Sequence, residues 1–190
     1  MTITSTSLPE VLIIKPKRFK DKRGWFLESF RKDLLEDAVG YSLDFCQENL
    51  AQSTYGVIRG LHYQMPPHAQ SKLVAILQGS VLEVVIDIRK GSPRFGEYLA
   101  VELSAEIQKQ LFIPRGFAHG YACLSETALL SYKVDNHYNK AAEASIAFND
   151  PQLNIDWQIP MEKQILSSKD REHPKFDAAQ WFDYNTPLYD

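Results

Sequence analysis

Short runs of residues that alternate between apolar and polar, or that are rich in β-branched and aromatic side chains, dominate the middle of the chain. Each run is closed by Gly, Pro, Asp or Asn, a combination typical of β-strands joined by turns. The ranges expected to form strands are 11–14, 24–30, 57–64, 73–77, 81–88, 98–103, 110–113, 118–124 and 128–134. So many short strands with turns between them predict an all-β sandwich or barrel.

Helical periodicity is scarce and lies outside the predicted strands. A helix is expected over 31–39, a single turn after Ser104, and short helical pieces over 177–182. From about residue 149 the chain loses the strand period and turns polar, so the segment 149–190 is expected to wrap around the barrel. The 190 residues contain no linker or internal repeat, and we expect one domain spanning 1–190.

Composition and charge exclude several classes of protein. Hydrophobic residues make up 44% of the chain and charged residues 24%, as in a globular protein rather than a disordered one. The net charge of −3 argues against a basic face that binds nucleic acid. No apolar run approaches the roughly 20 residues that span a bilayer, and the N-terminus lacks the pattern of a signal peptide. We therefore expect a cytoplasmic protein with no membrane or nucleic-acid partner. Cys46 and Cys123 form no CxxC motif, and both are expected to be buried thiols.

The chain lacks the signatures of several common catalytic folds. It has no GxxxxGK[ST] phosphate loop, no GxGxxG motif after a strand and no GxSxG elbow, so nucleotide hydrolysis, dinucleotide redox chemistry and serine hydrolysis lose support. Polar side chains instead gather inside strand-like segments, at 56–64, 70–74, 113–121 and 129–134. Because such groups are costly to bury unless they are paired, we expect them to line a binding cavity inside the barrel.

His62 lies in the middle of a predicted strand and shares a face with Gln64, because side chains alternate with a period of two. A neutral imidazole suits a general base near neutral pH, and a hydrogen-bonded core histidine is the alternative. Arg59 has the opposite parity, so an unbroken strand would not point both side chains inward. Gly60 between them is a candidate for a β-bulge that redirects one of them.

Other polar residues of these segments have two interpretations each. Lys72 at a strand start could stabilise negative charge that develops on an oxygen, or it could be a solvated charge at a sheet edge. Tyr132 and Tyr138 could serve the cavity or be ordinary core aromatics.

The segment from Pro114 to His119 reads P-x-G-x-x-H and resembles the second motif of the cupin superfamily. Metal-binding cupins have an Asn four residues later, where this chain has Cys123, and their first motif supplies two further histidines and a glutamate. This chain has His62 and His68 there, with no glutamate before Glu83. A cupin shell without a metal is expected, although a triad of His62, His68 and His119 stays open.

Six segments with matching order and spacing resemble the dTDP-4-dehydrorhamnose 3,5-epimerase family across nearly the whole chain. They are DKRGWFLESFR (21–31), 47–74, 79–96, LFIPRGFAHGYACLS (111–125), 132–151 and LSSKD (166–170). The resemblance implies a cupin-type jelly roll that works without metal or other cofactor on dTDP-4-dehydro-6-deoxy-D-glucose. It also implies a homodimer in which an N-terminal strand segment within about 1–45 is exchanged between subunits.

The same resemblance assigns catalytic roles. His62 matches the base that removes protons at C3 and C5, and Asp170 matches the carboxylate that orients it. Lys72 matches the cation beside the C4 oxygen. Tyr132 matches the acid that returns a proton from the opposite face of the sugar, so that the configuration inverts.

The resemblance also assigns substrate contacts. Arg59 and His119 match residues on the diphosphate and sugar, and Tyr138 matches a ring stacked on thymine. The residues that match other nucleotide or sugar contacts are Gln47, Asn49, Glu143 and Lys169. Those that match residues entering the site from the partner subunit are Arg23, Phe26 and Glu28.

Three positions depart from the family pattern. Glu83 replaces a usual Asp, Ala51 a frequent small hydroxyl residue and Tyr121 a Phe. None removes a catalytic group, but Glu83 could adjust the base or the depth of the pocket. The alternatives are an enzyme that inverts one carbon or moves the ketone, a sugar-binding cupin without activity, and a metal-dependent cupin oxygenase.

Overall fold

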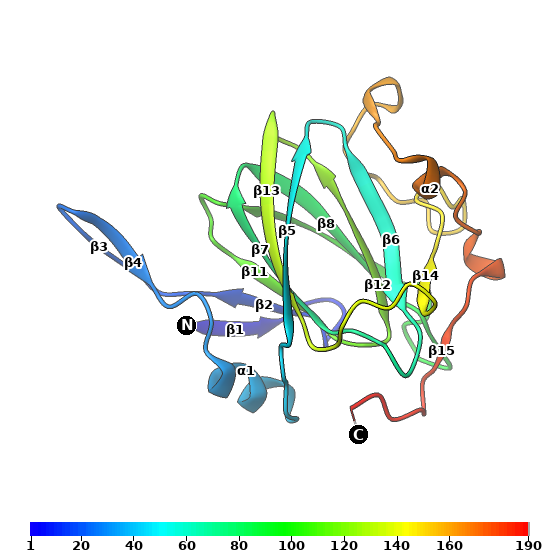
Figure 1. Ribbon diagram of the computed structural model, residues 1–190, viewed down its shortest axis with the longest axis horizontal. Helices are drawn as coiled ribbons and strands as arrows, with labels where there is room; N and C mark the ends of the chain where they lie inside the picture. Colours follow the sequence, from blue (N-terminus) through cyan, green and yellow to red (C-terminus); the bar gives the residue numbers. More distant parts are fainter. Residues whose placement is uncertain (190) are drawn as a thin grey trace.

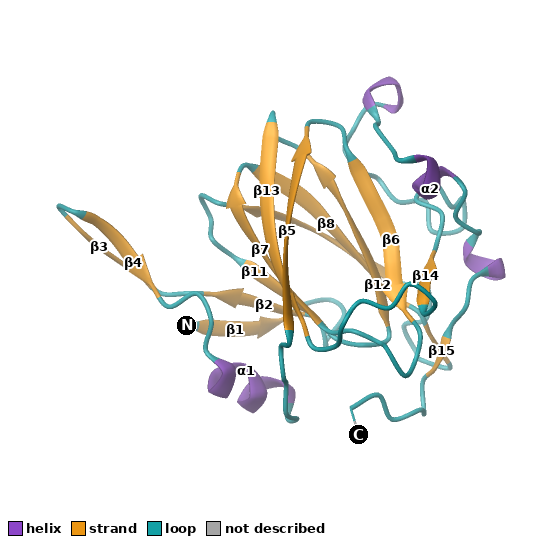
Figure 2. Cartoon of the chain, in the orientation of Figure 1, coloured by secondary structure: helices purple, strands orange, loops and turns teal. Residues whose placement is uncertain are grey.

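The computed structural model describes residues 1–189, whose strands form two main antiparallel sheets (Figures 1 and 2). The larger sheet has six strands in the order β1 (Thr2–Ser5), β2 (Leu12–Lys15), β11 (Gln110–Ile113), β7 (Lys72–Gln78), β13 (Thr127–Val134) and β5 (Gln47–Thr54). The smaller has five, in the order β10 (Tyr98–Ser104), β8 (Ser80–Asp87), β12 (Phe117–Cys123), β6 (Ile58–Gln64) and β14 (Glu143–Ser145).

The remaining elements lie at the periphery. Strand β15 (Phe182–Asp183) pairs in parallel with β9 (Arg89–Lys90). Strands β3 (Arg18–Asp21) and β4 (Gly24–Leu27) form a hairpin that projects away from the body of the molecule, at the left of Figure 1. The helical elements are α1 (Lys32–Val39), α2 (Ser168–Arg171) and the 3₁₀ turns η1 (Met161–Lys163) and η2 (Phe176–Ala178). None of the described helices is long and apolar enough to cross a membrane.

Side-chain alternation along the strands creates an apolar core between the two sheets. Val81 and Val85 of β8 share this core with Val74 and Ile76 of β7. Side chains at the same parity point to the same side of a strand. Glu83 must therefore face the space between the sheets with Val81 and Val85, and Lys72 must face it with Val74.

Two outer layers cover the opposite faces of the sheets. Leu82 and Ile86 of β8 pack with Trp157 and Phe176, so the segment after residue 149 covers the smaller sheet. Leu73 and Phe112 of the larger sheet pack instead with Leu35 of α1. With both faces covered, the central strands are buried throughout, which explains their dense apolar sequences.

The structure confirms the all-β expectation and places strands in each predicted range, with small shifts at the ends. The run predicted over 24–30 ends at Leu27, and 177–182 contains a 3₁₀ turn and the start of β15 rather than an α-helix. The segment after Ser104 is a hydrogen-bonded turn. Cys123 is buried, but the prediction for Cys46 is wrong because this residue is exposed, directly before β5.

Strand β5 was not predicted, and its sequence, QENLAQST, shows why. Its more buried positions include Gln47, Asn49 and Ser53. A strand whose inward face is polar lacks the apolar alternation by which strands are usually detected.

Candidate active site

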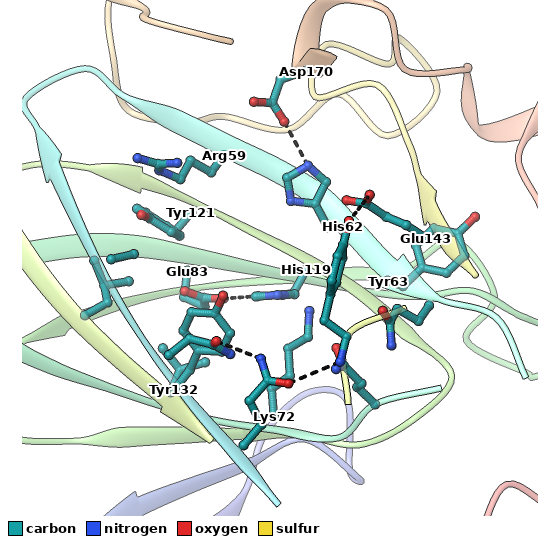
Figure 3. A pocket seen from close by; sticks show the side chains of 18 of the residues that line it. Arg59, His62, Tyr63, Lys72, Glu83, His119, Tyr121, Tyr132, Glu143 and Asp170 are labelled. Carbon is teal, nitrogen blue, oxygen red and sulfur yellow. Dashed lines mark hydrogen bonds and ion pairs between the residues drawn. The ribbon is translucent and has the colours of Figure 1, made fainter. Parts of the chain in front are cut away.

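A cavity of about 510 Å³ opens between the two sheets (Figure 3). This volume is in the range of small-molecule binding sites. Lys72 and Tyr132 reach it from the larger sheet, and His62 and His119 reach it from the smaller sheet. Figure 3 shows His62 and Asp170 above the hollow and Tyr132 below it.

Most of the residues singled out from the sequence line this cavity. They are Gln47, Asn49, Arg59, His62, Lys72, His119, Tyr132, Tyr138, Glu143, Lys169 and Asp170. Arg23, Phe26 and Glu28 do not, because they lie on or beside the projecting β3–β4 hairpin. Arg23 there pairs with Asp21 at 2.6 Å.

A β-bulge in β6 brings Arg59 and His62 to the same side, as the sequence suggested. On β12, His119 lies opposite His62 and Tyr121 lies opposite Arg59, so the ladder slips by one residue between them. Two residues of β6 therefore face a single residue, Gly120, and the parity of the strand changes. Both Arg59 and His62 consequently line the cavity.

Gly60 is required at this bulge by both conformation and space. Its φ is +134°, and a Cβ placed there would lie 2.5 Å from the Gly120 Cα atom. We expect Gly60→Ala to lower the free energy of unfolding by about 3 kcal/mol or more, measured by urea denaturation. Gly24→Ala is the matched control, because Gly24 has a φ of +132° but open space around its Cβ position. Equal losses in the two variants would contradict a steric role for Gly60.

His62 and Asp170 form a hydrogen-bonded pair at the cavity wall. The Nε2–Oδ1 distance is 2.8 Å. Burial raises the pKa of Asp170, but hydrogen bonds from His62 and Ser167 outweigh it and hold the pKa below its usual value. The ionised carboxylate can only accept, so Nε2 carries the proton of the neutral ring. The lone pair is then on Nδ1, which makes no hydrogen bond to any described residue.

Asp170 is fixed by its position on the short helix α2. The Ser167 hydroxyl caps this helix by accepting from the Asp170 backbone N–H and donates to the Asp170 carboxylate at 2.5 Å. The segment LSSKD thus contains a serine N-cap three residues before an acidic residue, a recognisable signal that sequence reasoning did not use for Ser167.

Lys72 and Glu83 place an amine and a carboxyl group in the buried part of the cavity. Lys72 is 8% exposed and Glu83 fully buried. Burial lowers the pKa of Lys72 to about 8, against the opposing effect of Glu83, and raises the pKa of Glu83 to about 8, against that of Lys72. The Lys72 ammonium makes no hydrogen bond to a described residue, so it is available to a ligand. It is a buried cation, not the solvated edge charge of the alternative interpretation.

Glu83 contacts His119 rather than the His62–Asp170 pair. Its Oε1 atom lies 2.6 Å from His119 Nδ1, while Oε2 has no hydrogen-bond partner in the described part of the chain. Burial, together with the charge of Lys72, keeps the pKa of His119 well below its ordinary value. Compared with the Asp usual at this position in the family, the longer side chain of Glu83 therefore changes the surroundings of His119 and Lys72, and not those of the His62–Asp170 pair.

Tyr132 and Arg59 approach the cavity from opposite sheets. Burial raises the pKa of Tyr132, with Arg59 opposing the shift, so the phenol stays protonated at neutral pH. Its hydroxyl has no partner among the described side chains. Arg59 donates to the Ser53 hydroxyl at 3.2 Å, and Ser53 lies 2.9 Å from the Tyr121 hydroxyl. Sequence reasoning did not identify this support for the Arg59 side chain.

The rim of the cavity is polar and partly exposed. Tyr138, on the rim, donates its hydroxyl to Glu143 at 3.0 Å, and Lys169 pairs with Glu143 at 2.5 Å. Gln47 donates to Asn49 at 2.8 Å and accepts from the Tyr138 backbone. These contacts hold an aromatic face and several hydrogen-bonding groups at the cavity mouth.

The cavity does not gather the histidine triad left open by the sequence. His68 lies 3.0 Å from Asn139 and is not among the lining residues. A different group, His62, Asp170 and His173, has three potential ligand atoms within 4.8 Å of one another.

The arrangement contains the groups needed to move protons beside a carbonyl. A histidine with a free lone pair faces a protonated phenol across the cavity, with a buried ammonium between the sheets. A general base and a general acid on opposite sides can remove and return a proton on different faces of one carbon. The cation can stabilise the oxyanion formed in between.

Comparisons with known proteins agree with this chemistry. A sequence model of dTDP-4-dehydrorhamnose 3,5-epimerase matches residues 5–178. The enzyme of that name from Shigella flexneri is 48% identical over 182 residues, which cover 96% of this chain and 99% of the relative. The crystal structure of dTDP-4-dehydrorhamnose 3,5-epimerase from Elizabethkingia anophelis NUHP1 has a TM-score of 0.90 at 48% identity, covering 93% of this chain and 97% of its own.

A further solved structure contains a sugar nucleotide. It is dTDP-6-deoxy-D-glucose-3,5-epimerase from Legionella pneumophila Philadelphia 1 in complex with dTDP-4-keto-L-rhamnose. Its TM-score is 0.92 at 41% identity, with 97% of this chain and 99% of that chain covered. These neighbours confirm the cupin-type jelly roll expected from the sequence.

Proposed function

The chain belongs to the dTDP-4-dehydrorhamnose 3,5-epimerase family, and from this premise we propose how the residues of its cavity perform the reaction. The enzyme is an isomerase that epimerises C3 and C5 of dTDP-4-dehydro-6-deoxy-D-glucose, giving dTDP-4-dehydro-L-rhamnose. The observation that supports the residue roles best is the placement of His62 and Tyr132 on facing sheets.

His62 is the general base. Its Nδ1 lone pair takes the proton at a carbon next to the C4 ketone, and the imidazolium that forms is stabilised by ionised Asp170 at 2.8 Å. This pairing also fixes the orientation of the ring. Asp170 does not touch the substrate in this proposal and acts by positioning His62.

Lys72 stabilises the enolate that follows. Removal of a proton beside the ketone moves negative charge onto the C4 oxygen, and a buried ammonium provides strong electrostatic stabilisation there. The reaction needs no metal or organic cofactor in this proposal, because the side chains supply the base, the acid and the positive charge.

Tyr132 is the general acid. It donates its phenolic proton to the carbon from the face opposite His62, which inverts the configuration. Burial raises the pKa of Tyr132, so the proton is present at neutral pH.

The pH dependence of kcat/KM tests the role of Lys72. As the pH rises through about 8, Lys72 loses its proton and the charge that stabilises the enolate disappears, so the rate is expected to fall there rather than near the ordinary lysine pKa of 10.5. Because Lys72 and Glu83 interact, this apparent pKa belongs to the pair. In Lys72→Arg the fall is expected at higher pH, since a guanidinium stays charged. An unchanged alkaline limb in Lys72→Arg would assign it to another group.

The rim binds the nucleotide. Tyr138 offers an exposed ring for stacking on thymine, and Gln47, Asn49, Glu143 and Lys169 offer hydrogen bonds at the mouth. Arg59 and His119 contact the diphosphate and the sugar deeper in the cavity. Binding of the nucleotide at the rim and of the diphosphate and sugar deeper in the cavity fixes the orientation of the sugar.

The β3–β4 hairpin completes the site of a second subunit in a homodimer. We propose that the hairpin is the exchanged part of residues 1–45, since β1 and β2 pair with the larger sheet of the same chain. Phe26 is 66% exposed and Trp25 is 56% exposed on this projecting arm. Large exposed aromatics at the end of an arm indicate a surface that another chain covers. Arg23, Phe26 and Glu28 would enter the partner's cavity, and residues 1–190 form one domain of that dimer. The cytoplasmic location stays a prediction.

A mixed dimer tests this exchange. A chain with Arg23→Ala and Phe26→Ala is co-expressed with a His62→Ala chain, and heterodimers are isolated with two different tags. If the hairpin acts in the partner, one site receives an intact base and an intact hairpin, so the heterodimer should recover about half of the wild-type rate. Each parent homodimer is expected to be nearly inactive. A heterodimer no more active than its parents would contradict the exchange.

Incubation of purified protein with dTDP-4-dehydro-6-deoxy-D-glucose, followed by proton NMR of the product, tests the overall reaction. The L-rhamno configuration requires inversion at both carbons. A product inverted at one carbon would identify a mono-epimerase instead.

A further inference from the structure

His173 is a buried side chain that the proposed reaction does not use. Its side chain is 4% exposed, and neither ring nitrogen has a hydrogen-bond partner among residues 1–189. The backbone of Ile146 lies beside the ring without making a hydrogen bond of normal geometry. A buried polar group without a partner destabilises the folded protein. A ligand that binds to these nitrogens would offset that cost.

The ring of His173 lies directly beside the His62–Asp170 pair. His173 Nε2 is 3.9 Å from Asp170 Oδ1, which is too far for a hydrogen bond. The His173 and His62 rings meet edge to face, with centroids 5.2 Å apart. The unpartnered imidazole therefore points into the space that the other two groups border.

These three side chains have the composition and spacing of a zinc site. Two imidazoles and one carboxylate are a common ligand set for Zn²⁺, with a fourth position left for water. Tetrahedral coordination at about 2.0–2.1 Å requires ligand atoms about 3.3 Å apart. The distances of 2.8 Å from His62 to Asp170 and 3.9 Å from Asp170 to His173 lie on either side of that value. All three ligand atoms are within 4.8 Å of one another, so small side-chain rotations would close the site.

We propose that His62, Asp170 and His173 form an inhibitory binding site for Zn²⁺ in which the ion occupies Nε2 of the catalytic histidine. The inhibition rests on the proposed role of His62, whereas the binding site does not. The bound Zn²⁺ inhibits the enzyme, and the reaction itself does not require the ion.

The inhibition follows from the chemistry of the imidazole ring. In the free enzyme the neutral ring carries its proton on Nε2 and its lone pair on Nδ1. When Zn²⁺ takes the lone pair of Nε2, the single proton of the neutral ring must reside on Nδ1. Nδ1 then has no lone pair, and His62 can no longer take a proton from the sugar. No net proton is lost from the ring in this exchange of positions.

Calorimetric titration with Zn²⁺ tests the site, and solvent deuterium exchange into the substrate tests the inhibition. Wild-type protein is expected to bind one Zn²⁺ per chain, to lose exchange at least tenfold when saturated, and to recover with EDTA. In His173→Phe, which keeps a ring against His62, Zn²⁺ affinity should fall at least tenfold. Its remaining exchange rate should be insensitive to the Zn²⁺ concentration that inhibits the wild type. Each variant is compared with itself with and without metal.

Two controls keep the outcomes distinct. His137→Gln removes an exposed histidine and should leave both zinc binding and inhibition as in the wild type. His173→Gln is a second substitution in case His173→Phe does not fold, and Co²⁺ absorption reports tetrahedral ligation directly.

Equal Zn²⁺ binding by wild type and both His173 variants would overturn the site. Binding without loss of exchange would overturn the inhibition, while absence of exchange in metal-free wild type would count against the proposed function alone.

Discussion

Replacing His62 by Ala is expected to lower kcat/KM by about 10²–10⁴-fold, the usual contribution of a general base. The reason is that no other described side chain at the cavity combines a free nitrogen lone pair with an ionised partner such as Asp170. Solvent exchange at C3 and at C5 should fall together, because one base serves both carbons. Proton NMR in deuterated water follows both positions in one experiment.

His68→Ala is the matched control, since His68 contacts Asn139 and does not line the cavity. It should retain nearly full exchange. If His62→Ala lost exchange at one carbon only, the enzyme would have a second base, and the single-base mechanism would be wrong.

Replacing Tyr132 by Phe is expected to separate proton exchange from inversion. Product formation should fall about 10²–10⁴-fold because the acid is missing. His62 can still remove a proton and return a solvent deuteron to the same face, so the substrate should gain deuterium while it keeps its configuration. NMR of the recovered sugar distinguishes deuterated substrate from inverted product.

Tyr63→Phe is the control for a tyrosine at the same cavity. The Tyr63 hydroxyl is already engaged, because it donates to the Gln180 carbonyl at 2.5 Å. Its removal should affect stability more than inversion. If Tyr132→Phe formed inverted product at the wild-type rate, Tyr132 would not be the acid.

Much of the barrel could be predicted because its central strands are apolar on both faces. Strand β11 was predicted with its observed ends, and β8 to within one residue at each end. Strand β5 was not predicted because its inward positions, such as Gln47 and Asn49, line the cavity instead of packing in the apolar core. Hydrophobic patterns thus fail to predict a strand whose inward side chains are selected for binding a ligand and not for packing in the core.

The prediction of the site residues depended more on the resemblance to a known family than on the pattern of apolar and polar positions. Parity alone placed Arg59 and His62 on opposite faces, and the bulge that reconciles them was detectable only through Gly60. Asp170 is more than a hundred residues from His62 in sequence, and no local pattern links them. The position of Glu83 against His119 required the register of β8 and β12, which period-two alternation does not supply.

The burial of His173 also lay beyond sequence reasoning. Nothing in the polar C-terminal segment indicates that this one side chain turns inward beside Asp170. Tertiary contacts of a segment without regular structure leave no periodic signal. Such segments can therefore carry functional groups that only a structure reveals.

The most direct test of the mechanism is the fate of solvent deuterium during turnover of dTDP-4-dehydro-6-deoxy-D-glucose by wild-type protein in deuterated water. The proposed mechanism predicts product with the L-rhamno configuration and deuterium at both C3 and C5, because His62 removes each proton and Tyr132 returns a solvent-derived one. Inverted product that retained its original hydrogen at either carbon would contradict this account.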